Sequence, residues 1–138
     1  MKKNMKIEFH NVDDNIAKFY HKLKESQEIN GIIIGFGDTD DGLISDQMIT
    51  IDDSPVAFIS VSQDESNDLT IEGFEVIASK RNQGIGKSII TCFQKKIKYN
   101  RVNLIPQNED SLRFWEQCGF VAHDNGFNMF MEWEKKNK

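Results

Sequence analysis

The chain has 138 residues, of which 38% are hydrophobic and 28% are charged, and its formal net charge at pH 7 is −5. This length fits one domain, which we expect to cover residues 1–138 and to bury a core without disulfides or metal ions. The negative charge argues against a nucleic-acid-binding protein, and a mean hydropathy of −0.52 with no long apolar run argues against a membrane protein.

The first half of the sequence predicts one helix and four strands. Alternating apolar residues predict a half-buried strand at 5–9, and apolar residues at helical spacing predict a helix at 16–23. Two apolar stretches at 48–51 and 56–61 flank an Asp-Asp-Ser-Pro segment, which has the composition of a hairpin turn. A further apolar stretch at 69–77 predicts the next strand.

The second half predicts two helices and three strands. Apolar residues recur every four positions over 85–97, which predicts a long amphipathic helix, and a short apolar strand follows at 102–105. The segment 108–119 begins with an Asn that can cap a helix and ends with a Gly that can close it. Strands at 120–122 and 127–133 flank an Asp-Asn-Gly turn. This order of elements predicts an α/β fold with a mixed sheet and helices packed on it.

The two cysteines and the N-terminal segment bear on location and metal binding. Cys92 and Cys118 belong to no Cys-x-x-Cys motif or Cys/His cluster, so they indicate neither a disulfide framework nor a metal site. The first ten residues carry charge but lack the apolar segment of a secretion signal. We therefore expect a cytoplasmic protein that binds no metal.

A glycine-containing turn between a predicted strand and a predicted helix is the first candidate for a binding site. Gly84 and Gly86 stand at the start of the helix, where the first backbone amides have no partner within the helix and attract anions. Arg81 and Lys87 add positive charge in a stretch, 76–108, that contains no acidic residue. We therefore expect a phosphate or pyrophosphate site, with a turn that binds nothing as the alternative.

Two common phosphate-binding motifs do not fit this turn. A P-loop would need glycine at position 81, where Arg81 stands, and the dinucleotide-binding fingerprint would need glycine at position 89, where Ile89 stands. A third motif does fit. Arg81-x-x-Gly84-x-Gly86 resembles the (Gln/Arg)-x-x-Gly-x-(Gly/Ala) motif of the GNAT superfamily of N-acetyltransferases.

A second segment resembles the same family. The run from Asn108 to Phe120, Asn-Glu-Asp-Ser-Leu-Arg-Phe-Trp-Glu-Gln-Cys-Gly-Phe, is similar to the family's Asn-…-Phe-Tyr-Glu-x-x-Gly-Phe segment, one helix and one strand beyond Gly86. The resemblance in element order covers about residues 5–133. It implies a central, mostly antiparallel sheet with one splayed parallel strand pair, helices on both faces, and acetyl-CoA as the cofactor.

The resemblance also implies which residues hold acetyl-CoA. The backbone at Val76 and Ile77 would bind the acetyl carbonyl and the pantetheine arm, which Asn108 would also contact. Arg81 would add charge, and Trp115 would pack on the pantetheine or cover the thioester. The pyrophosphate would be bound by the amides of Gln83, Gly84, Ile85, Gly86 and Lys87.

The implied reaction is direct transfer of an acetyl group to a primary amine of a small molecule or peptide. Glu72 and Glu75 are the candidates for the base that removes the ammonium proton. They stand three apart, so on a regular strand they face opposite sides, and at most one faces the cleft unless a bulge intervenes. We expect Glu75 to be that residue because it is nearer the implied acetyl site.

One position departs from the family pattern. Trp115 stands where the family frequently has a tyrosine that acts as general acid, and an indole N–H cannot release its proton at useful pH. The phenols of this chain, Tyr20 and Tyr99, stand elsewhere in the sequence. The alternative function is therefore a non-catalytic acyl-CoA-binding module that acts as a sensor or protein partner. Strand edges near the end of the chain would permit a homodimer.

Overall fold

The computed structural model describes residues 5–33, 35–37, 44–63, 68–98, 101–124, 126 and 129–135. Its strands are β1 (Ile7–Asn11), β2 (Ile44–Ile51), β3 (Ser54–Gln63), β4 (Leu69–Val76), β5 (Arg101–Leu104), β6 (Val121–Asp124) and β7 (Met129–Glu134). Its helices are α1 (Asp14–Glu25), α2 (Ile85–Lys96) and α3 (Glu109–Gln117), with a short 3-10 turn, η1 (Ala78–Lys80). In this part of the chain no helix is both long enough and apolar enough to cross a membrane.

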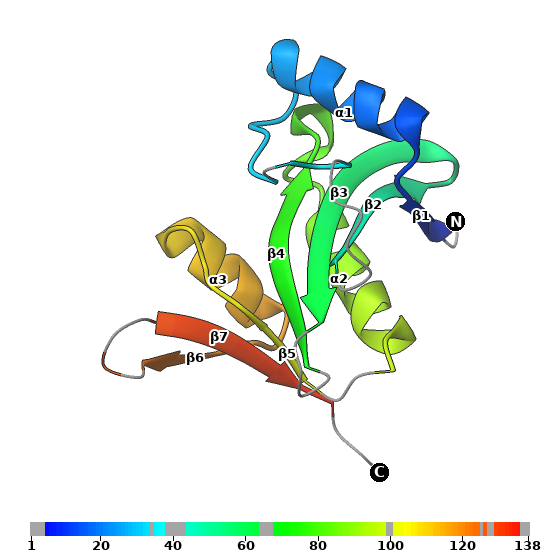
Figure 1. Cartoon of the computed structure of the whole chain (residues 1–138). Helices are drawn as coiled ribbons and strands as arrows, with labels where there is room; N and C mark the ends of the chain where they lie inside the picture. The colour runs from blue at the N-terminus through cyan, green and yellow to red at the C-terminus, as the bar shows by residue number, and fades with distance from the viewer. Residues whose placement is uncertain are drawn as a thin grey trace.

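The strands form one seven-stranded sheet in the order β1-β2-β3-β4-β5-β7-β6. All neighbours are antiparallel except β4 and β5, which are parallel. These two strands pair at two positions, Leu69 with Val102 and Thr70 with Asn103, and then diverge (Figure 1). The mostly antiparallel sheet with one splayed parallel pair is therefore confirmed.

Helices cover both faces of this sheet (Figure 1). The interior strand β3 lies between two cores, because Ala57 and Ile59 pack on one face of the sheet and Phe58 on the other. Buried residues of α2 and α3 join the first core, and Tyr20 of α1 joins the second. The expected arrangement of helices on both faces is confirmed.

The β2–β3 hairpin turns more tightly than the sequence predicts. Asp52 and Asp53 both have positive φ, 50° and 70°, and they alone connect the strands. Two residues with positive φ match the right-handed twist of a hairpin, and Asp tolerates this backbone region. Ser54 and Pro55 belong to β3. Pro55 pairs with Thr50 of β2 and Ala57 pairs with Ile49, so Val56 is an extra residue beside the proline.

Candidate active site

The two glycines of the turn serve different purposes. Gly84 is the N-cap of α2 with φ 74°, and nothing lies within 4 Å of where its Cβ would be, so its requirement is conformational. A Cβ on Gly86 would lie 3.0 Å from Cε1 of Phe114 in α3, so glycine at this position leaves room for the ring. The turn is thus shaped to begin α2 and to let α3 approach its first turn.

The N-terminus of α2 is suited to an anion. No side chain caps it, and its first turn contains no acidic residue. The amides that begin the helix therefore lack intrahelical partners, and the helix dipole places partial positive charge there.

A cavity of about 620 Å³ lies beside this turn, between β4, the turn and α3. Its wall includes seven of the predicted cofactor-binding residues: Val76, Arg81, Gly84, Ile85, Gly86, Lys87 and Trp115. Lys80 adds a third positive charge beside Arg81 and Lys87. The sequence motif and the helix after β5 thus meet in one cavity.

Three other predicted cofactor residues are placed differently. Ile77 is buried in the core under α1, and Gln83 is exposed and donates its side-chain amide to the Ser79 carbonyl at 3.3 Å. Asn108 caps α3, where its Oδ1 accepts the Ser111 amide at 2.8 Å. Among the described residues on the cavity wall, these three side chains are not found.

Several residues that line this cavity were not predicted from the sequence. Most of them lie on one face of α3, where positions 110, 111, 114 and 117 follow helical spacing around Trp115. That spacing was readable in the sequence and could have identified them. The missed residues are Phe74, Asn82, Asp110, Ser111, Phe114 and Gln117.

A second, smaller cavity of about 50 Å³ adjoins the first, where β4 and β5 diverge. Phe74, Ser111 and Trp115 line both cavities. Glu72 of β4 and Ile32 of the segment after α1 also line the small one. A molecule that extends from the glycine turn along β4 would therefore reach Glu72.

A bulge in β4 determines how the two predicted glutamates are placed. Val61 of β3 pairs with Ile71, but Ser60 pairs with Gly73, so Glu72 is the extra residue. Glu72 is exposed, and among the described residues its carboxylate accepts a hydrogen bond from Oγ of Ser62 at 2.5 Å. Glu72, the bulged residue, is one of the residues that line the small cavity.

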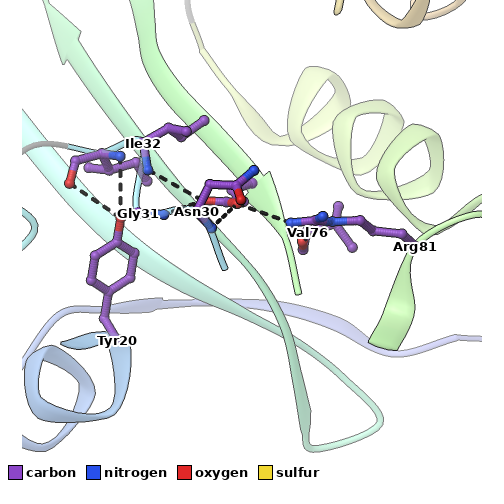
Figure 2. A network of polar contacts seen from close by, with 8 residues as sticks. Tyr20, Asn30, Gly31, Ile32, Val76 and Arg81 are labelled. Atoms are coloured by element: carbon purple, nitrogen blue, oxygen red, sulfur yellow. Dashed lines mark hydrogen bonds and ion pairs between the residues drawn. The ribbon is translucent and has the colours of Figure 1, made fainter. Parts of the chain in front are cut away.

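Glu75 is buried and accepts four hydrogen bonds. Oε2 accepts the Asn30 amide at 2.5 Å and Nη2 of Arg81 at 3.0 Å. Oε1 accepts the amides of Gly31 at 3.0 Å and Ile32 at 3.4 Å. Figure 2 shows the three amides on one side of this network and Arg81 on the other. A carboxylate offers about four lone-pair positions, so every acceptor position of Glu75 is occupied.

The sequence matches the family model described as Acetyltransferase (GNAT) family over residues 7–120. The chain belongs to this family. The match includes the glycine turn, the bulged strand β4 and α3, so the site described above lies within the GNAT region. A comparison with curated proteins by sequence found no match.

Solved structures of GNAT proteins have the same fold at low sequence identity. A ribosomal-protein-S18-alanine N-acetyltransferase from Escherichia coli superposes with a TM-score of 0.69 at 12% identity and covers 96% of each chain. A spermidine N-acetyltransferase variant from Vibrio cholerae has a TM-score of 0.71 at 10% identity, over 94% of each chain. An N-acetyltransferase from Campylobacter jejuni in complex with acetyl coenzyme A has a TM-score of 0.68 at 12% identity, over 95% of this chain and 100% of its own.

Trp115 departs from the GNAT tyrosine, and its surroundings show what the indole does in this fold. It is 6% exposed and packs edge-on against Phe74, Phe114 and Phe120, with ring centroids 5.9, 4.9 and 5.2 Å away. These rings form a rigid apolar wall beside both cavities.

Among the described residues, no tyrosine lines either cavity of this GNAT site. The Tyr20 hydroxyl donates to the Ile33 carbonyl at 3.3 Å and accepts the Ile33 amide at 3.2 Å, and burial raises its pKa. Tyr99 lies outside the described residues. Tyr20 thus has a structural role, because it links α1 to Ile33 in the segment that follows this helix.

Proposed function

We propose that this GNAT protein is an N-acetyltransferase that uses acetyl-CoA to acetylate a primary amine of a small molecule or peptide. The observation that carries the proposal is the cavity of about 620 Å³ that joins the uncapped N-terminus of α2 to the aromatic wall of α3. Its one end suits an anionic diphosphate and its other end suits a thin, mostly apolar chain. Acetyl-CoA has both parts.

The residues fit this cofactor in a definite order along the cavity. The amides of Gln83, Gly84, Ile85, Gly86 and Lys87 would hold the pyrophosphate. Lys80, Arg81 and Lys87 would balance its charge. The pantetheine arm would run along Val76 and Ile77, past Asn108 at the cap of α3, with Trp115 beside the thioester.

The amine must lose a proton before it attacks, because an ordinary alkylammonium group is protonated at neutral pH. We assign the base role to Glu72, which lines the small cavity and accepts one hydrogen bond among the described residues, from Ser62. Glu75, which we favoured from the sequence, has no acceptor position left. Glu72 would accept the proton directly or through one water molecule.

The departing thiol needs no phenol in this scheme. A thiol pKa of about 8.5 makes the thiolate a tolerable leaving group at neutral pH, and solvent can protonate it. The role of Trp115 is then to exclude water from the thioester and to keep it against β4.

The test is release of free CoA thiol from acetyl-CoA in the presence of amines. The panel contains a polyamine and a peptide with an N-terminal alanine, because two structural neighbours are named for such acceptors. With an accepted amine, Glu72→Gln should lower kcat at pH 7 by about 100-fold or more, with recovery at high pH as the amine deprotonates itself. The control is Glu25→Gln, which also removes one negative charge but lies on α1, outside the lining of both cavities.

Equal rates for Glu72→Gln and the wild type at every pH would exclude the base role. Tight binding of acetyl-CoA with no thiol release across the panel would favour the second candidate function, a non-catalytic acyl-CoA-binding module. The observation that favours that candidate is the indole of Trp115 where GNAT proteins frequently have a phenol.

We also propose a cellular location and an oligomeric state. A cytoplasmic location is consistent with Cys92 and Cys118, which are both free thiols. A homodimer through β6 is consistent with its position at the sheet edge, where all four of its residues are exposed.

A further inference from the structure

Glu75 connects two parts of the chain that lie on different cavities. On one side are the amides of residues 30–32, and the last of these residues lines the small cavity. On the other side is Arg81, which lines the large cavity. The Glu75 side chain is 5% exposed and the Arg81 side chain 39%, so a buried carboxylate holds the guanidinium of a partly exposed arginine.

Arg81 is held at two points of its guanidinium. Nη2 donates to Glu75 at 3.0 Å, and Nε donates to the Val76 carbonyl at 2.9 Å (Figure 2). Two bonds from one planar group fix its orientation as well as its position. The charge of Arg81 is therefore held on the wall of the cavity beside the uncapped amides of α2.

We propose that Glu75 is a positioning residue: it fixes Arg81 for the anionic part of acetyl-CoA and fixes residues 30–32 beside the acceptor amine. The proposal rests on the proposed function. In this proposal Glu75 contributes to the affinity for acetyl-CoA and for the amine, and Glu72 removes the proton.

The chemistry of the four contacts explains why a glutamate is needed here. All four donors are N–H groups, so both oxygens must accept. In Glu75→Gln one oxygen is replaced by an NH₂ group, which would face two donors and could accept neither. The variant is nearly the same size, so it tests the hydrogen bonds and the charge rather than the packing.

The experiment is a double-mutant cycle on acetyl-CoA binding, measured by calorimetry for the wild type, Glu75→Gln, Arg81→Gln and the double variant. Each single change should weaken binding about tenfold, which corresponds to about 1.4 kcal/mol. Since Glu75 acts through Arg81, the double variant should bind no more weakly than Arg81→Gln alone. The control is Lys18→Gln, which removes one positive charge on α1, outside the lining of both cavities. It should bind acetyl-CoA like the wild type.

Kinetics and hydrogen exchange separate positioning from other roles. Glu75→Gln should raise the KM for acetyl-CoA and for the amine while the pH profile of kcat stays as in the wild type. Without any ligand, the amides of residues 30–32 should exchange faster in Glu75→Gln. A changed pH profile, or losses that simply add in the double variant, would overturn the positioning role and leave the proposed function intact.

Two further outcomes concern acetyl-CoA binding by the wild type and the folding of Glu75→Gln. If the wild type binds no acetyl-CoA, the proposed function fails and this inference fails with it. If Glu75→Gln does not fold, Arg81→Lys decides, because lysine keeps the charge but cannot donate to both Glu75 and Val76 in the same way. Binding by Arg81→Lys several-fold weaker than by the wild type supports the fixed orientation, and full affinity overturns it.

Discussion

At the scale of single residues, burial sets the chemistry of the two thiols. Cys118 closes α3, is 7% exposed, and burial raises its pKa to about 11. Cys92 lies half-buried on α2, on a groove that faces β1. Only thiolates react rapidly with disulfide reagents.

We expect the native protein at pH 8 to react with a thiol-specific disulfide reagent at Cys92 and to react at Cys118 only after unfolding in urea. The folded protein keeps the Cys118 proton up to about pH 11, whereas the unfolded chain releases it near 9.0. The stability that comes from this difference is therefore complete below pH 9 and is lost as the pH rises through 11. Rapid reaction of two thiols in the native protein would contradict this account.

Residues 84 and 86 show how far a motif can be interpreted from sequence. The motif identified both glycines, and the structure shows what surrounds each of them. The sequence could not show that Gly84 has a φ of 74° or that Gly86 leaves room for the ring of Phe114. The second feature depends on α3, which is distant in the sequence.

At the scale of elements, helical periodicity was the reliable signal. The long helix predicted at 85–97 is α2, and the one predicted between Asn108 and Gly119 is α3. The start of β2 was missed because residues 45–47, just before the apolar stretch, are polar. Asp46 is nevertheless buried, since its Oδ2 accepts the Gly37 amide at 2.9 Å and its carbonyl accepts the Val12 amide at 3.1 Å.

The surroundings of Glu72 and Glu75 could be predicted only in part. The sequence indicated two candidate bases. A bulge in the strand would change which of them faces the cleft. The position of the bulge and the amides that surround Glu75 could not be read, because those amides come from 43–45 residues earlier in the chain. Contacts over such separations leave no local pattern in a sequence.

Helix α1 holds the segment that follows it through one hydroxyl. Tyr20 bonds both the amide and the carbonyl of Ile33, and its ring stacks on Phe36 at 4.3 Å. We expect Tyr20→Phe to keep the packing and to lower the free energy of unfolding by about 1–3 kcal/mol, because the buried Ile33 amide loses its partner. Urea denaturation measures this change, and an unchanged midpoint with an unchanged slope would contradict it.

At the scale of the whole molecule, the splayed sheet creates the site. Strands β4 and β5 share only two residue pairs, and both cavities adjoin the region beyond them, under α3. The positive residues of the stretch 76–108 fall partly on the large cavity, although the whole chain carries a charge of −5. The organisation of residues 1–138 as one domain stays a prediction.

The central claim is that this cavity binds acetyl-CoA, and thermal unfolding with acetyl-CoA or ATP tests it most directly. A ligand at 100 times its dissociation constant stabilises the folded state by about 2.7 kcal/mol. For a domain of this size the Tm should rise by at least about 5 °C with acetyl-CoA, and the rise should be absent with ATP. An unchanged Tm with acetyl-CoA at millimolar concentration, or an equal rise with ATP, would contradict the claim.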